Sequence, residues 1–219
     1  MSDTDKSRRI KDLDAFLEES LREKQPEEVK EFYESWANTY DEEVSLFNYN
    51  GPKLMAKEFA KLNVPKNVEV IDIAAGTGAL GEELKALGYT CIDALDGTKG
   101  MLEVARKKNI YRNLFQFLFG CDDKSPITNG TYDLAVSCGG IGPGHIPYSA
   151  FHDILAMVKQ GGLVCWLTVN PKEGEEKETF NSVITELKDS GKWEAVQDPV
   201  RVEEFYKKEF ALFYVMKKL

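Results

Sequence analysis

The sequence predicts an α/β fold in which helices cover both faces of a mostly parallel, seven-stranded sheet. Short apolar runs alternate with helical patterns between residues 67 and 170, and each parallel step in a sheet needs such a crossover. The 219 residues are 42% hydrophobic and 30% charged, which suffices for one sizeable core. We therefore expect one main domain at 51–219, preceded by a helical extension or lid at 1–50.

Helical periodicity dominates the first sixty residues. Apolar residues at three- and four-residue steps predict a helix from about residue 9 to before Pro26, a second at 27–40 and a third at 54–62. The alternating region that follows predicts strands at 67–73, 89–96, 114–120, 131–138 and 162–170, with helices at 79–88, 98–108 and 148–159. A charged helix is expected at 175–190. Strand-like segments at 191–200 and 209–219 can then form an antiparallel hairpin at one edge of the sheet.

Charge and cysteine content limit the classes of partner. A net charge of −9, a pI near 4.9 and the lack of a long basic run disfavour a nucleic-acid interface. Four scattered cysteines and two histidines indicate neither a metal site nor a disulfide framework, so reduced, buried thiols are expected. The charged N-terminus and the short apolar runs favour a cytoplasmic protein without membrane insertion.

The stretch VIDIAAGTGALGEEL, which starts at residue 70, combines a strand, a small-residue turn and a helix. Gly76 and Gly78 carry no side chains, so the backbone amides at the start of the helix can face a ligand. Asp96 ends the next strand, 18 residues after Gly78, where a carboxylate can accept hydrogen bonds from both hydroxyls of a ribose. The unit predicts an adenosine-containing ligand; a packing turn followed by an ordinary surface aspartate is the structural alternative.

The turn does not carry the full GxGxxG pattern that a dinucleotide pyrophosphate prefers. Asp72, inside the first strand, adds a negative charge that is a poor neighbour for pyrophosphate. It can instead orient the glycine loop or receive an ammonium group, which suits a nucleoside that bears an amino acid. An NAD(P)-dependent oxidoreductase stays an alternative, because it would use the same turn and Asp96.

These segments resemble the class I S-adenosylmethionine-dependent methyltransferases. VIDIAAGTGALGEEL is similar to their first motif, DxGxGxG, with Ala74 where glycine is usual. DALDGTKGMLEVARKK, FGCDDKSP, GTYDLAVSCGGIGPGHIP and KQGGLVCWLTVN resemble the later segments, so that the likeness covers about residues 30–170. It implies a Rossmann-like methyltransferase fold, with S-adenosylmethionine as the methyl donor and S-adenosylhomocysteine as the product.

The resemblance also implies cofactor-binding roles for the first two strand tips. The residues that would line the methionine side are Asp72, Ala74, Gly76 and Gly78. Asp96 would take the ribose hydroxyls, and the methyl group of Ala74 would narrow the space beside the methionine portion.

Two further segments would enclose the adenine. Gly97 and Met101 would flank the ring, and Cys121 and Asp122 would fix it through a backbone amide and a carboxylate. For Asp122 an ordinary solvated loop position is the alternative.

The aromatic segment FYESWANTYDEEVSLFNYNGP, which starts at residue 32, precedes the core. In similar enzymes this region folds over the cofactor as a lid. Tyr40 would then reach the methionine carboxylate, and Trp36 and Tyr49 would wall the pocket. The alternative is a helix that packs Phe32, Trp36 and Tyr40 against the sheet, because aromatics at helical spacing are often core residues.

The chemistry itself needs few residues. Methyl transfer from a sulfonium is an in-line displacement, to which a protein contributes alignment and exclusion of water. Ser137 and Cys138, at the end of the fourth strand, would lie beside the sulfonium. His145 in the following loop is the candidate general base, unless it is structural or merely exposed.

The sequence does not identify the methyl acceptor. It favours a small molecule or a protein over nucleic acid. No NPPY-like tetrapeptide follows the fourth strand; enzymes that methylate amino groups of bases and of glutamine resemble one another in carrying it. A non-catalytic S-adenosylmethionine-binding protein stays a further alternative.

Overall fold

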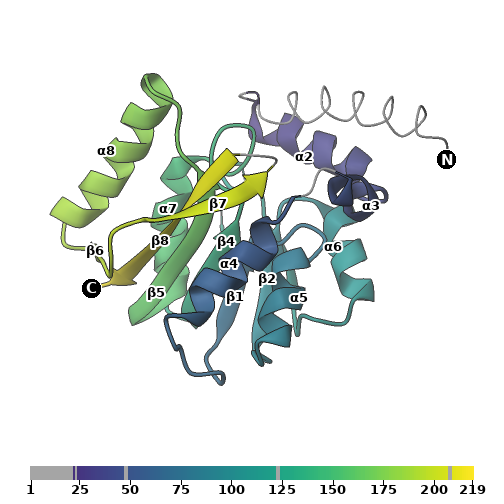
Figure 1. Cartoon of the computed structure of the whole chain (residues 1–219), viewed down its shortest axis with the longest axis horizontal. Helices are drawn as coiled ribbons and strands as arrows, with labels where there is room; N and C mark the ends of the chain where they lie inside the picture. The colour runs from purple at the N-terminus through teal and green to yellow at the C-terminus, as the bar shows by residue number, and fades with distance from the viewer. Residues whose placement is uncertain (1–21, 23, 47–48, 122–123, 207–208) are drawn as a thin grey trace.

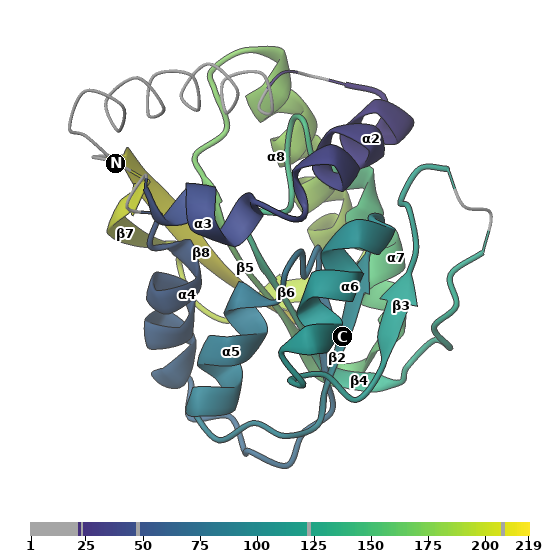
Figure 2. The same cartoon turned by 90° about the vertical axis from the view of Figure 1, so that its right-hand side faces the viewer.

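A computed structural model describes residues 22, 24–46, 49–121, 124–206 and 209–219. A twisted sheet forms the centre, and helices pack on both of its faces (Figures 1 and 2). The strand order is β3-β2-β1-β4-β5-β8-β6, and β7 also pairs with β8. The predicted fold class is confirmed. The helix expected at 9–25 falls almost entirely outside the described residues.

Five parallel strands carry the first half of the sheet. They are β1 (Val70–Ile73), β2 (Ile92–Asp96), β3 (Leu114–Gln116), β4 (Tyr132–Cys138) and β5 (Val158–Val169). β1 lies between β2 and β4, with Asp72 in register with Ala94 and Val136. All residues of β1 and β2 are buried, as expected for strands covered on both faces.

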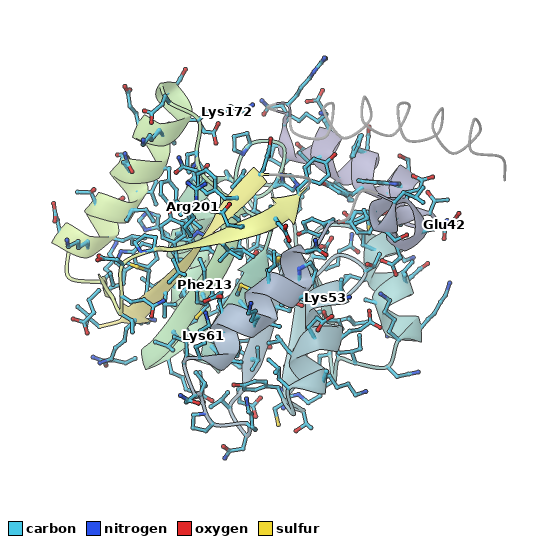
Figure 3. All side chains as sticks on the ribbon, in the orientation of Figure 1. Glu42, Lys53, Lys61, Lys172, Arg201 and Phe213 are labelled. Carbon is cyan, nitrogen blue, oxygen red and sulfur yellow. The ribbon has the colours of Figure 1, made fainter. Side chains whose placement is uncertain are left out.

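Helices form the outer layers. They are α2 (Pro26–Trp36), α3 (Tyr40–Ser45), α4 (Gly51–Ala60), α5 (Ala79–Ala86), α6 (Lys99–Lys107), the 3₁₀ helix η1 (Tyr148–Ala150), α7 (Phe151–Met157) and α8 (Glu175–Asp189). Figure 2 shows α4, α5 and α6 on one face of the sheet, with α2 and α3 crossing above it. In Figure 3, Phe213 lies inside the protein near α4, whereas Lys53 and Lys61 extend away from that helix.

The C-terminal part contains one strand more than predicted. β8 (Glu209–Lys218) runs antiparallel to β5. Its other edge is shared by β6 (Trp193–Ala195) and β7 (Val200–Tyr206), so that the sheet counts eight strands over the described residues. The span at 200–206 had been expected only to connect two strands. It pairs with β8 because the three residues of β6 leave most of that edge without backbone partners.

The boundary between α7 and β5 also differs from the prediction. The helix ends at Met157, whereas it was predicted to reach residue 159, and β5 begins at Val158, before the predicted strand start at residue 162. The pairing register with β4 shifts between Tyr132 and Leu134. The residues of β5 between Val158 and Leu163, which include Gly161 and Gly162, thus interrupt the regular pairing with β4.

Candidate functional site

The tips of β1 and β2 are joined through one carboxylate. The backbone N–H of Gly76, in the turn after β1, donates a 2.8 Å hydrogen bond to Asp96 Oδ2, and the N–H of Thr98 donates one of 2.8 Å to Oδ1. Asp96 is buried, and burial raises its pKa. Since each carboxylate oxygen has about two acceptor sites, both oxygens keep capacity for further donors. The glycine turn and the acid are therefore neighbours, as the sequence predicted.

A cavity of about 120 Å³ lies above these strand tips, between the turn, β4 and the helices α2 and α3. The predicted site residues that line it are Tyr40, Tyr49, Ala74, Gly76, Asp96, Gly97, Met101, Cys138 and His145. These residues come from distant parts of the chain, and the fold brings them to the carboxyl ends of neighbouring strands, where α/β proteins bind ligands.

Asp72 and Gly78 do not line this cavity. The Tyr111 hydroxyl donates a 2.6 Å hydrogen bond to Asp72 Oδ2, and burial raises the pKa of Asp72 to about 7. A Cβ on Gly78 or Gly81 would come within 3.0 Å and 2.3 Å of the Tyr111 side chain. These two glycines thus make room for Tyr111 rather than for a ligand. No periodic pattern around Tyr111 signals this role in the sequence.

Ala74 adopts a left-handed conformation, with φ +54°, which costs a non-glycine residue about 1–2 kcal/mol. Its methyl group packs on the loop after β4, because a Cβ on Gly140 would lie 2.3 Å from Ala74 Cβ. Because Gly140 has no side chain, the loop leaves room for the methyl group of Ala74. This pairing of two distant positions has no local sequence signal.

The lid helices, as we name α2 and α3, are joined to the core by acidic side chains. Asp41 accepts a 2.5 Å hydrogen bond from Thr77 Oγ1 in the glycine turn and lies 2.8 Å from Lys108 Nζ. Glu34 accepts the backbone N–H of Gly100, at the start of α6, at 3.1 Å. The segment 26–45 thus packs over the cavity as well as against the core.

Comparison with known proteins decides the family. The family model for the methyltransferase domain matches residues 70–162 of this chain. Methyltransferase-like protein 27 of Homo sapiens is 32% identical over 168 residues, which are 75% of this chain and 68% of that protein. The chain belongs to the class I S-adenosylmethionine-dependent methyltransferases.

Solved structures share the fold of this methyltransferase. A chain in the complex between the Haloferax volcanii Trm112 methyltransferase activator and a methyltransferase matches with a TM-score of 0.63 and 17% identity, over 87% of this chain and 97% of that one. A SAM-dependent methyltransferase from Thermotoga maritima matches with a TM-score of 0.55 and 16% identity, over 85% and 98% of the two chains.

The aromatic residues of the lid divide into two groups in this methyltransferase. Tyr40 and Tyr49 line the cavity, and the Tyr49 hydroxyl lies 3.5 Å from Cys138 Sγ. Trp36 is 3% exposed and does not line it; its indole N–H donates to Glu43 at 2.7 Å. Trp36 also contacts Tyr40, with ring centroids 4.7 Å apart. Trp36 therefore packs behind the tyrosines, which matches the packing alternative more closely than a pocket wall.

The region expected to hold adenine contains residues that the sequence did not single out. Thr98, Phe117, Leu118 and Phe119 line the cavity together with Gly97 and Met101. The apolar run at 114–120 was expected to be entirely strand, but β3 ends at Gln116, so the aromatic residues beyond it curve toward the cavity.

Cys121, Asp122 and Ser137 complete the predicted set. Cys121 is absent from the lining of the cavity, and its thiol donates to Glu27 Oε1 at 3.0 Å. Asp122 lies outside the described residues. Ser137 is 3% exposed, and its hydroxyl has no hydrogen-bond partner within the described part of the chain. It lies directly below the cavity wall, since a Cβ on Gly140 would be 3.1 Å from Ser137 Oγ.

His145 is held in one orientation. Its Nδ1 lies 3.0 Å from the carbonyl oxygen of Pro143, and its Nε2 lies 2.8 Å from the Tyr33 hydroxyl. Burial lowers the pKa of His145. His145 is thus neither an exposed loop residue nor distant from the cavity, which Tyr33 also lines.

The described residues contain no cluster of three or more potential metal ligands. Over the same residues, no helix has both the length and the apolar character needed to span a bilayer.

Proposed function

We propose that this methyltransferase binds S-adenosylmethionine in the cavity above β1, β2 and β4 and transfers its methyl group to a small-molecule or protein acceptor. The observation that carries the proposal is the carboxylate of Asp96, oriented by the N–H groups of Gly76 and Thr98 on the cavity wall. Each oxygen accepts one of these backbone N–H groups, and the remaining acceptor sites of the carboxylate suit the two adjacent hydroxyls of a ribose. Membership of the family favours this methyl donor over a nicotinamide dinucleotide.

The residues of the cavity fit the three parts of the cofactor. Gly97, Met101, Phe117 and Leu118 offer an apolar slot for adenine beside Asp96. Along the other wall, Tyr40, Ala74, Gly76 and Cys138 would surround the methionine portion. The Ser137 hydroxyl, which has no hydrogen-bond partner among the described residues, supports this fit, because a buried polar group without a partner is costly unless a ligand or water satisfies it.

Bound S-adenosylmethionine supplies a methyl group on a sulfonium, which is activated toward nucleophiles. The chain's own contribution is to orient the acceptor and keep water out. The lid helices cover the cavity, and Tyr40 is half-buried against the rings of Tyr33 and Trp36. Such positioning in a closed site can account for much of the rate enhancement of a displacement reaction.

Charge and enclosure support the proposed acceptor class. The net charge of −9 opposes approach to a phosphate backbone. The cavity lies beneath two helices and is narrow, so a small molecule or a single protruding side chain fits better than a nucleic-acid duplex. Tight RNA binding that weakens steeply with salt would overturn this part of the proposal.

Calorimetric titration with S-adenosylhomocysteine and with NADH tests the cofactor. We expect binding of the first only, and loss of at least about tenfold in affinity in Asp96→Ala, because charge-assisted hydrogen bonds contribute about 1.5–3 kcal/mol. Asp133→Asn is the matched control. Asp133 holds Lys159 and the Glu69 N–H at the opposite end of β4, so this variant tests loss of a structural carboxylate. Unchanged affinity in Asp96→Ala would remove the ribose assignment.

Turnover distinguishes an enzyme from a protein that only binds the cofactor. The measurement is transfer of radiolabelled methyl groups from S-adenosylmethionine to fractionated metabolites and proteins. We expect labelling of an acceptor, and its loss in Asp96→Ala. Binding of S-adenosylhomocysteine without any labelled product would support the non-catalytic alternative.

A further inference from the structure

A tyrosine and a histidine form a hydrogen-bonded pair on the cavity wall. Tyr33 Oη lies 2.8 Å from His145 Nε2, and His145 Nδ1 lies 3.0 Å from the carbonyl oxygen of Pro143. Because a carbonyl oxygen can only accept, Nδ1 carries the proton and Nε2 accepts the hydroxyl proton of Tyr33. A tyrosine hydroxyl is both a donor and an acceptor, so Tyr33 can take up one proton as it gives up its own.

The fold places this pair at the tip of β4. The backbone N–H of Ile146 donates to the carbonyl of Gly140 at 3.1 Å, and Ile141 and Ile146 form a β-bridge. The loop after β4 therefore turns back, so that His145 lies near Gly140 and Cys138, beside which we place the methyl donor. Tyr33 comes from α2, where its ring stacks on Trp36 with a centroid distance of 6.0 Å.

The charges around His145 favour its neutral form. The groups that face it or share its cavity are Tyr33, Lys24, Lys30, Tyr40, Tyr49 and Asp96. Burial is the main cause that lowers the pKa of His145, and the charge of Lys24 acts in the same direction. A neutral imidazole at neutral pH can take up a proton.

We propose that Tyr33 and His145 form a proton relay that deprotonates a hydroxyl group on a small, neutral, largely apolar acceptor. This inference rests on the proposed methyl-transfer function. The acceptor oxygen forms a bond to the methyl carbon, the carbon–sulfur bond breaks, and its electron pair remains on sulfur in S-adenosylhomocysteine. The acceptor proton passes to Tyr33 Oη while the Tyr33 proton passes to His145 Nε2. The positive charge of the sulfonium thus ends on the imidazolium, whose Nδ1–H stays bonded to Pro143.

A hydroxyl acceptor explains the relay better than an amine or a thiol does. A phenol ionises only near pH 10, so it benefits from a base at neutral pH, whereas a thiol ionises near pH 8.5 without help. An ammonium group would bring a further positive charge next to Lys30, which lines the cavity, and the methyl donor. Pro26, Val29 and Ile146 line the cavity near the relay and provide an apolar surface for the body of the acceptor.

The first test uses a phenol, a thiophenol and an aniline with the same ring substituents as methyl acceptors. Tyr33→Phe removes the relay, and His145→Asn keeps an N–H for Pro143 but removes the base. We expect each variant to lower methyl transfer to the phenol by about 10²-fold or more, with less effect on the thiophenol. Affinity for S-adenosylhomocysteine should fall much less than in Asp96→Ala, since both variants keep the carboxylate of Asp96 with its two backbone N–H donors. His152→Asn, on α7 beside Glu186, is the control and should keep wild-type rates.

The outcomes separate the two proposals. Failure of the wild type to bind S-adenosylhomocysteine would refute the proposed function. Binding without transfer to the phenol, or equal transfer in wild type, Tyr33→Phe and His145→Asn, would overturn the relay and leave the cofactor site intact. The acid limb of the kcat profile should also disappear in His145→Asn, because below the His145 pKa the wild-type imidazole is already protonated.

A second readout does not depend on activity. In ¹⁵N spectra of histidine-labelled protein without ligands, His145 should show a protonated Nδ1, an unprotonated Nε2 and a pKa below the usual 6.5. Tyr33→Phe should shift the Nε2 signal, and saturation with the phenol should shift it in the wild type alone. An Nε2-protonated tautomer, or no response to Tyr33→Phe, would overturn the proposal.

Discussion

The Tyr111 hydroxyl donates a 2.6 Å hydrogen bond to the buried carboxylate of Asp72. Asp72 is in β1, and Tyr111 is in the connection between α6 and β3. The bond therefore links the first strand to a connection much later in the chain. The Tyr111 ring also occupies the space beside Gly78 and Gly81. Of the two roles considered for Asp72, this arrangement favours orientation of the glycine turn over direct contact with the ligand.

Neutralising Asp72 should stabilise the protein above neutral pH. Burial raises the pKa of Asp72 from its usual 3.8 to about 7. The folded state therefore holds its proton more tightly than the unfolded chain, and the contribution of Asp72 to stability decreases as pH rises from about 4 to 7. Asp72→Asn should remove this loss and raise the free energy of unfolding at pH 8 by on the order of 1–3 kcal/mol. Urea denaturation at pH 5 and pH 8 measures the effect.

Asp133→Asn provides a control of opposite sign. Although burial opposes ionisation of Asp133, hydrogen bonds from Lys159 and the Glu69 N–H lower its pKa. Its stabilising contribution is present above the usual pKa and is lost as pH falls, so Asp133→Asn should weaken the protein at pH 8. The side chain is 35% exposed, and solvent screening limits the effect to about 1 kcal/mol. Destabilisation by Asp72→Asn at pH 8 would show that the ionised carboxylate of Asp72 stabilises the folded protein, and it would contradict a raised pKa.

Ala74 and Gly140 should show strong coupling in a double-mutant cycle. Gly140→Ala places a Cβ 2.3 Å from that of Ala74 and should cost about 1–3 kcal/mol by overpacking. Ala74→Gly removes both that clash and the left-handed alanine, so the same Gly140 substitution in this background should cost less by at least about 1 kcal/mol. Free energies of unfolding for the four proteins measure the coupling.

Gly130→Ala is the matched control for this cycle. Gly130 has a positive φ, unlike Gly140, and a Cβ there meets nothing within 4 Å. Gly130→Ala should lower the free energy of unfolding through backbone strain alone. Its effect should be additive with that of Ala74→Gly. Equal costs of Gly140→Ala in both backgrounds would show that the loop after β4 moves away from the turn.

The sequence predicted features that depend on local pattern. Alternation of buried runs and helices is enough to predict the parallel sheet, and the distance from Gly76 to Asp96 spans one crossover, which places both at adjacent strand tips. Trp36 was harder to place, since aromatic residues at helical spacing can face either the core or a pocket. Both orientations occur in the lid helices: Tyr40 faces the cavity, and Trp36 packs behind it.

Features that depend on long-range contacts were not predictable. Tyr111 meets Asp72 across 39 residues, and Tyr33 meets His145 across 112. No periodicity or motif joins such positions, because their proximity follows from the order of strands and from how loops fold back. β7 was missed for a similar reason: its pairing depends on how short β6 is.

Asp41 should control how long the cofactor stays bound. Its carboxylate joins Thr77 of the glycine turn and Lys108 of the core to the lid helix α3. Asp41→Asn keeps an acceptor for Thr77 but loses the ion pair, so we expect the dissociation rate of S-adenosylhomocysteine to rise about 2–5-fold, because a partly exposed ion pair contributes up to about 1 kcal/mol. Stopped-flow measurements at low and high salt test this.

The wild-type dissociation rate should increase with salt toward that of Asp41→Asn, since salt screens the pair with Lys108. Glu103→Gln, which removes an exposed charge on α6 near Lys99, should leave the rate unchanged. A salt response equal in wild type and Asp41→Asn would assign the effect to other charges.

Modification of Cys138 should report opening of the lid helices. Burial raises the pKa of Cys138 to about 12, although the nearby Tyr49 hydroxyl acts in the opposite direction. At pH 8 the thiolate fraction is therefore very small in the closed protein, and iodoacetamide should react far faster with the partly exposed Cys91. Asp41→Asn should accelerate modification of Cys138, and saturating S-adenosylhomocysteine should slow it. Cys165, buried within the sheet, is the internal reference: if it reacts as fast as Cys138, the reaction proceeds through global unfolding instead of movement of α2 and α3.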